Sequence, residues 1–303
     1  MITYEWADSW HEEPEVVALL DESARFDAEQ GFSATPPQLD PGPAGHARHR
    51  ELVAWMSPEV GSVTPGRRCA VAFARVSIGG DGDGVLELLV HPEFRSLGVG
   101  TLLAEELGFV VGEQGWAGTG ATSLRTWARG SHPAAERMGR RFGAEVERSV
   151  WRIVRPGKAH DRLPVDSFGI TVEPAGAERE KLARVSTAWL APVDKNDDAE
   201  LLVAKDKEGA VVGFVALNLP GAPGSEGPRL GTIRTLGLAP GADEHAARAT
   251  LLSHAVDHLT EAGAREVDML VNAVGDDLVR TCRVLGFHHD QTDLCFRVPL
   301  RNA

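Results

Sequence analysis

The sequence has 303 residues, more than an average single domain needs, and its 43% hydrophobic and 25% charged residues are typical of a globular protein. The formal net charge of −13 disfavours nucleic acid or an anionic membrane as a partner, because both bind basic surfaces. Three cysteines without Cys-x-x-Cys spacing argue against a disulfide framework and against a thiolate zinc site, so no metal is expected.

The sequence offers no targeting or membrane signal. Its first residues lack the basic and then apolar stretch of a secretory signal, and no apolar run approaches the roughly 18 residues of a membrane span. We therefore expect a cytoplasmic protein, either a monomer or a homodimer.

Hydrophobic periodicity predicts alternating strands and helices in the first half of the chain. Strands are expected at 2–6, 51–56, 69–77, 85–91, 123–128 and 145–155, and helices at 13–30, 97–113 and 133–141.

The second half repeats this order. Strands are expected at 170–174, 201–206, 211–219, 233–238, 266–271 and 294–299, and helices at 177–190, 243–262 and 277–285. The polar, breaker-rich residues 155–164 indicate a linker. We therefore expect a domain at 1–155, a linker at 156–168 and a second domain at 169–303. An internal duplication explains the repeated order, and two unrelated α+β domains are the alternative.

One loop carries the clearest chemical signal. A nearly apolar strand runs into His91 and Pro92, and the chain then continues through Arg95-Ser96-Leu97-Gly98-Val99-Gly100 into a helix. Glycines at a helix start let a ligand approach the free backbone N–H groups, where the helix dipole also favours an anion. An arginine at this place can add a charge-assisted bond to a phosphate.

Other glycine-loop interpretations fit less well. A dinucleotide fingerprint needs a third glycine where Leu103 stands, and a Walker loop needs a lysine that Gly100-Thr101-Leu102 lacks. Glycines placed for packing alone remain the simplest alternative.

The pattern Arg95-x-x-Gly98-x-Gly100 after a strand resembles motif A of the GNAT acetyltransferases, which is Arg/Gln-x-x-Gly-x-Gly/Ala. The resemblance implies an α/β (α+β) fold of two tandem GNAT-like domains, each a mixed twisted sheet flanked by helices and splayed after its fourth strand. It also implies acetyl-CoA as co-substrate. The residues expected at the cofactor are Leu89, Val90 and His91 at the strand's end, and Arg95, Ser96, Leu97, Gly98, Val99, Gly100 and Thr101 at the phosphates.

The tandem arrangement resembles the mycothiol synthase branch of the family, but the second half departs from it. The residues aligned with Arg95, Gly98 and Gly100 are Asp243, Ala246 and Arg248, which would repel a phosphate and close the cradle. Thr232 stands where the resemblance implies a glutamate, and Cys282 where it implies a tyrosine general acid. The second domain is therefore expected to be a degenerate copy.

Chemistry is then expected in the first domain. Glu87 is the only ionisable residue inside the apolar strand, and two roles stay equally open for it: a general base, or a partner in a structural ion pair. His132 could replace the missing tyrosine, although a helix-start role suits it better. The expected function is acetyl transfer to a primary amine of a small molecule. The alternatives are mycothiol synthase activity itself and a catalytically silent acetyl-CoA-binding or scaffolding protein.

Overall fold

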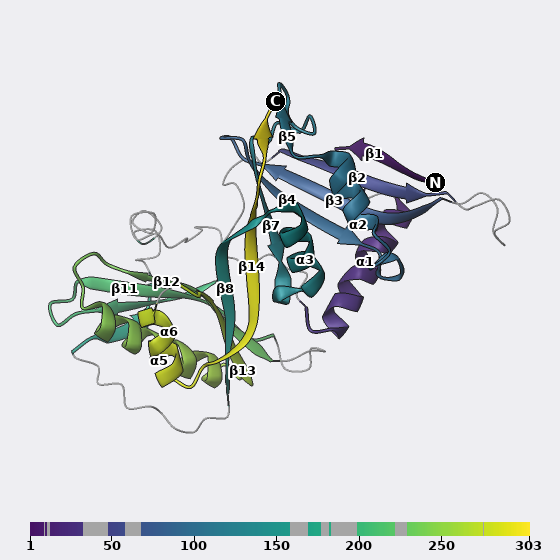
Figure 1. Cartoon of the computed structure of the whole chain (residues 1–303). Helices are drawn as coiled ribbons and strands as arrows, with labels where there is room; N and C mark the ends of the chain where they lie inside the picture. Colours follow the sequence, from purple (N-terminus) through teal and green to yellow (C-terminus); the bar gives the residue numbers. More distant parts are fainter. Residues whose placement is uncertain are drawn as a thin grey trace. The chain divides into compact units, whose positions relative to one another are not determined.

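The fold comes from a computed structural model, which describes residues 1–8, 10, 13–32, 48–57, 68–157, 169–176, 182, 199–221, 229–274 and 276–303. These residues form two compact units (Figure 1). Unit 1 is made of Met1–Ser149 together with Thr292–Ala303, and unit 2 is Val150–Gln291.

Unit 1 is built on a six-stranded part of the sheet with the order β1-β2-β3-β4-β7-β14. Its strands are β1 (Ile2–Ala7), β2 (Arg48–Met56), β3 (Cys69–Ile78), β4 (Asp83–Val90), β7 (Ser123–Ala128) and the C-terminal part of β14 (His288–Val298). β4 and β7 pair in parallel, whereas the other neighbouring strands in this order are antiparallel.

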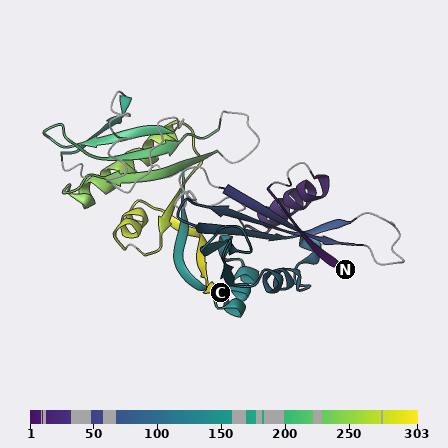
Figure 2. The same ribbon diagram turned by 90° about the horizontal axis from the view of Figure 1, so that it is seen from above.

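Helices cover both faces of the unit 1 sheet (Figure 2). Helix α1 (Pro14–Glu29) packs with Val53 and Phe73, whereas α2 (Val99–Leu107) packs with Leu52 and Ala72. Since successive strand residues face opposite sides, these helices lie on opposite faces. The remaining elements are η1 (Pro92–Phe94), η2 (Arg129–Ser131), α3 (Pro133–Phe142) and a small sheet of β15 (Arg301–Asn302), β5 (Val110–Gly112) and β6 (Gly115–Trp116).

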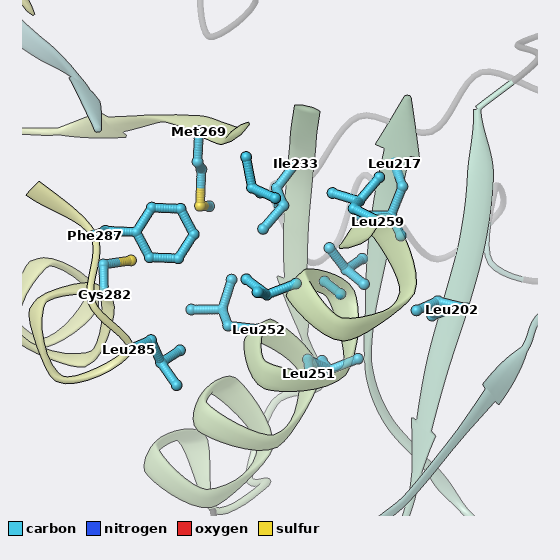
Figure 3. Close-up of a cluster of buried hydrophobic side chains, with 14 of the residues drawn as sticks. Leu202, Leu217, Ile233, Leu251, Leu252, Leu259, Met269, Cys282, Leu285 and Phe287 are labelled. Carbon is cyan, nitrogen blue, oxygen red and sulfur yellow. The ribbon is translucent and has the colours of Figure 1, made fainter. Parts of the chain in front are cut away.

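Unit 2 repeats the plan around its own core. Its strand order is β8-β13-β12-β11-β10-β9, where the strands are β8 (Glu145–Pro156), β13 (Glu266–Asn272), β12 (Leu230–Leu238), β11 (Val211–Asn218), β10 (Glu200–Lys205) and β9 (Thr171–Pro174). Helices α5 (Glu244–Glu261) and α6 (Asp276–Val284) bury leucines against this sheet, including Leu251, Leu252 and Leu259 (Figure 3).

The compact units do not follow the sequence repeats at their last strands. Leu294–Val298 of β14, from the end of the chain, pair with β7 in unit 1. Val150–Pro156 of β8, from the end of the first repeat, pair with β13 in unit 2. The division at 1–155 and 169–303 therefore stays a prediction about the repeated segments, and most of the expected linker at 156–168 lies outside the described residues.

Most elements occur where periodicity predicted them, and two differ from their predicted bounds by more than three residues. The predicted helix at 97–113 ends at Leu107, because Gly108 adopts a positive φ of 63° and the chain continues into β5. The strand predicted at 294–299 begins earlier, at His288. Only Leu294–Val298 pair with β7, and the residues before them extend the strand toward its N-terminal end. The predicted helix at 177–190 lies outside the described residues, apart from Leu182.

Candidate active site

The site is organised by a parting of two parallel strands. β4 and β7 are both fully described, and they pair only from Asp83–Ser123 to Leu86–Thr126. β4 nevertheless continues to Val90, paired on its other edge with β3. The backbone edge of residues 87–90 is thus released from β7. An unpaired strand edge can donate and accept hydrogen bonds with an extended ligand.

The glycine loop lies directly beyond this edge. Gly98 is the N-cap of α2, with a left-handed φ of 87°, and it supplies no side chain to cap the helix. A Cβ added at Gly98 would meet no atom within 4 Å, so internal packing does not explain this glycine. The N–H groups of Gly100 and Thr101 lie in the first turn, where a helix offers them no acceptor of its own. The loop therefore fits the expected anion cradle.

Gly100 is less open than Gly98. A Cβ at Gly100 would stand 3.5 Å from Val90 Cγ2 and 3.8 Å from Met138 Cε, which are ordinary contacts. A small side chain would fit at Gly100. The open space at the start of α2 therefore lies beside Gly98, where an added Cβ meets no atom.

Unit 2 parts its strands in the same way but fills its helix start. β12 and β13 pair from Leu230–Glu266 to Ile233–Met269, although both strands run further. Asp243 is the N-cap of α5, and its Oδ1 accepts a hydrogen bond of 3.1 Å from the N–H of Ala246. Ala246, which aligns with Gly98, already lies within the first turn of the helix. The Ala246 N–H, which could otherwise donate to a bound anion, is therefore already bonded to a carboxylate of the protein.

The side chain of Arg95 is engaged inside unit 1. Its Nε donates to the Val90 carbonyl at 2.9 Å, and its Nη2 lies 3.2 Å from Asp27 Oδ2, while Nη1 bonds Asp27 Oδ1. The guanidinium also stacks on Phe26, 5.2 Å from the ring centroid. The expected bond to a phosphate stays a prediction, and it competes with these contacts.

His91 also points to α1. Its Nδ1 accepts from the N–H of Glu93 at 3.3 Å, and its Nε2 lies 3.0 Å from Glu22 Oε2. The histidine side chain thus fixes the turn after β4. Its backbone is engaged as well, because the N–H donates to the Val71 carbonyl at 3.0 Å and the carbonyl accepts from the Phe94 N–H at 2.9 Å. A contact between His91 and the cofactor stays a prediction.

Glu87 belongs to a row of alternating charges that crosses the sheet. Glu51, Arg75 and Glu87 are direct cross-strand partners on β2, β3 and β4. Arg75 donates to Glu51 Oε1 at 2.8 and 2.9 Å, and its Nη1 lies 3.9 Å from Glu87 Oε2. Arg129 Nη2 lies 3.3 Å from Glu87 Oε1. The structural ion pair is therefore present, and the role as base stays a prediction.

The strand that carries Glu87 is regular. The β3–β4 pairing runs from Ile78–Gly84 to Ala72–Val90 without a register shift, so these two described strands pair without a bulge. Glu87 and Leu89 consequently face α1, while Leu86, Leu88 and Val90 face α2, as strict alternation predicts.

The resemblance implies a tyrosine general acid at about Gly139 in the first domain and at Cys282 in the second. Gly139 packs so closely that a Cβ there would stand 3.0 Å from Phe296 Cε1, so any side chain at this position would have to displace the Phe296 ring. Cys282 lies in the core of unit 2, and burial raises the pKa of its thiol to about 12. His132 caps α3, with Nδ1 accepting from the Ala134 N–H at 3.1 Å, and burial lowers its pKa. His132 thus serves as the N-cap of α3.

Asp27, Arg75 and Arg129 were missed by the sequence reasoning. Each lies on a different element, and no local pattern marks it. Only the strand register and the packing of α1 bring them to the ends of β4. Thr232, where a glutamate was expected, donates to Asp268 Oδ1 at 2.7 Å inside unit 2.

Two further features are absent from the part of the chain that the structure describes. No cluster of three or more His, Cys, Asp or Glu side chains suited to a metal ion occurs among them. No helix within the described part of the chain is long and apolar enough to cross a membrane.

Known proteins support the expected resemblance. The chain is 26% identical over 251 residues to a mycothiol acetyltransferase of Sanguibacter keddieii, covering 75% of this chain and 78% of the relative. It is also 26% identical over 305 residues to a mycothiol acetyltransferase of Mycobacterium sp. (strain JLS), covering 90% and 96%. No family model matches the sequence.

The fold has solved counterparts. A tandem GNAT protein from the clavulanic acid biosynthesis pathway superposes with a TM-score of 0.60 at 18% identity, covering 97% of this chain and 98% of that one. The expected α/β fold of two tandem GNAT-like domains is thereby confirmed.

The capping of α5 by Asp243 has a measurable consequence. Replacing Asp243 by Ala removes the acceptor for the Ala246 N–H, and we expect the free energy of unfolding to fall by about 1 kcal/mol. Urea unfolding measures it. The control is Glu244→Gln in the same first turn, whose 70% exposed side chain pairs with Arg248 but caps no N–H group, and it is expected to cost less than Asp243→Ala. Equal effects of the two variants would contradict a cap at this helix.

Proposed function

We propose that this chain, a GNAT-type acetyltransferase with tandem domains, transfers an acetyl group from acetyl-CoA to a primary amine of a small molecule in unit 1. The observation that carries the proposal is the combination of a released β4 edge with an uncapped helix start at Gly98. In this proposal the end of β4, at Leu89, Val90 and His91, contacts the pantetheine arm. The backbone of Arg95–Thr101 holds the pyrophosphate at the positive end of α2.

A local cradle also explains how an acidic protein could bind an anionic cofactor. The protein carries a formal net charge of −13, so its overall field repels an anionic cofactor. Backbone N–H groups aimed at one point bind phosphate without adding net charge. A cofactor site of this kind can therefore work within an acidic protein.

The reaction that fits is direct transfer. A base takes a proton from the acceptor's ammonium group, and the neutral nitrogen then attacks the thioester carbonyl carbon. The carbon–sulfur bond breaks as the amide forms, and the departing thiolate takes up a proton. Glu87 is our candidate base, because it lies on β4 where this strand parts from β7 and its side chain is about one-third exposed. The group that reprotonates the thiolate is left unassigned.

A second candidate function rests on the relatives. Proteins named mycothiol acetyltransferase match most of this chain, which favours an acceptor like theirs. The resemblance places the chemistry of that branch in the second domain, whose helix start is capped here by Asp243 and whose Cys282 is buried. We therefore rank a different amine acceptor first, and an acetyl-CoA-binding protein without turnover last.

Gly98 and Gly241 provide a matched pair for the cofactor site. Both glycines have positive φ, 87° and 82°, and an added Cβ at either meets no atom within 4 Å. A glutamate at Gly98 would place a carboxylate against the phosphates, so we expect Gly98→Glu to weaken acetyl-CoA binding by at least about a hundredfold. Gly241→Glu carries the same strain and charge in the loop before α5 and is expected to bind like wild type.

Calorimetry with acetyl-CoA measures both variants. One site per chain that is lost only in Gly98→Glu supports the proposal. Two sites per chain, or a loss in Gly241→Glu instead, would contradict it.

The role of Glu87 is tested by turnover. If Glu87 is the base, Glu87→Gln keeps the shape of the side chain but lowers the transfer rate across a panel of amines by roughly 10²-fold or more, with acetyl-CoA affinity unchanged. Glu51→Gln is the control, since Glu51 also pairs with Arg75 but lies away from the released edge. A small and equal loss in both variants would show that Glu87 acts only in the ion pairs.

A further inference from the structure

Arg95 lies at the junction of three segments of unit 1. Its backbone begins the cradle loop, its Nε donates to the last carbonyl of β4 at Val90, and its outer nitrogens bond both carboxylate oxygens of Asp27 near the end of α1. Three of the roughly five guanidinium N–H donors are therefore used by the protein. The two side chains are only 20% and 16% exposed, which limits competition by water.

We propose that Arg95 is a positioning residue, and that Asp27 is its obligatory partner. The pair ties α1 to the end of β4 and holds the loop in the shape that aims the N–H groups at the phosphates. The arginine side chain itself does not bind the cofactor. This inference rests on the proposed function, because it assigns the means by which that same site is kept in shape.

The geometry supports this assignment over a direct phosphate contact. A bidentate arginine–carboxylate pair has a fixed direction and is stronger than a neutral hydrogen bond. Turning the guanidinium toward a ligand would break this pair, release the Val90 carbonyl and leave the largely buried Asp27 without its arginine. Ser96, the next residue, has a positive φ of 64°, so the loop has a backbone conformation that needs support from its neighbours.

The His91–Glu22 contact supports the same view. His91 Nε2 lies 3.0 Å from Glu22 Oε2, so α1 contacts the turn after β4 at a second point. α1 therefore braces both ends of the segment between His91 and Arg95. A helix on the face opposite α2 thus contributes to a cradle formed at the start of α2.

The two interpretations predict opposite signs for one substitution. If Arg95 binds phosphate directly, Asp27 competes with the ligand, and Asp27→Asn should tighten acetyl-CoA binding by freeing the guanidinium. General electrostatics also predict tighter binding, since the protein becomes less negative. If Asp27 positions Arg95, the same substitution loosens the loop. We then expect acetyl-CoA to bind about threefold to thirtyfold more weakly.

The experiment is a double-variant cycle measured by calorimetry with acetyl-CoA on the full chain. Asp27→Asn and Arg95→Gln are each expected to weaken binding, and the double variant is expected to be no weaker than the poorer single variant. Asp27→Glu keeps the carboxylate and is expected to restore most of the affinity, which a general loss of stability would not allow. Circular dichroism confirms that each variant is folded.

Glu5→Gln is the control for charge. Glu5 lies on β1, away from the cradle, and the substitution removes one negative charge and the 2.7 Å pair between Glu5 and Arg68. The affinity for acetyl-CoA is expected to stay within about twofold of wild type. Tighter binding by Asp27→Asn, or additive losses in the double variant, would overturn the positioning role. If wild type itself fails to bind acetyl-CoA, the proposed function fails, and this inference fails with it for that separate reason.

Discussion

The parting of β4 and β7 is the constraint on which the rest of unit 1 depends. The strands pair only as far as Leu86 and Thr126, so the last residues of β4 keep one edge unpaired. β3 holds the opposite edge in register up to Val90, so the free edge is not a frayed end. The loop and the start of α2 follow the end of this strand in the chain, and Glu87 lies on the strand just beyond its last pair with β7.

The two units show how one fold can leave a helix start open or close it through a single cap. Both units part their central parallel strands and follow with a helix. In unit 1 the N-cap is Gly98, which leaves the first-turn donors without a side-chain acceptor. In unit 2 the N-cap is Asp243, which satisfies a donor and adds a negative charge. A helix start that is stabilised by its own carboxylate is poorly suited to bind a phosphate.

The sequence was sufficient for the order of the longer described strands and helices, because periodicity and breakers are local signals, but it missed the short strands β5, β6 and β15. It also identified the loop at Arg95–Gly100 and the acidic loop at Asp243, since the contrast between glycine and aspartate at a helix start is visible in the residues themselves. It could not predict that Asp27 bonds Arg95, that Arg75 and Arg129 flank Glu87, or that Phe296 occupies the space beside Gly139. Those contacts join segments far apart in the chain, and they depend on strand register and helix packing. The pairing of the C-terminal strand with β7 escaped prediction for the same reason.

Hydrogen–deuterium exchange in the presence of acetyl-CoA tests the central claim most directly, because it reports on backbone N–H groups. The account predicts slower exchange at residues 96–101 when acetyl-CoA is added, since these amides lie in the proposed cradle. It predicts no change at residues 239–248, where Asp243 already accepts from the helix start. Protection that appears at 239–248 and not at 96–101 would contradict the account.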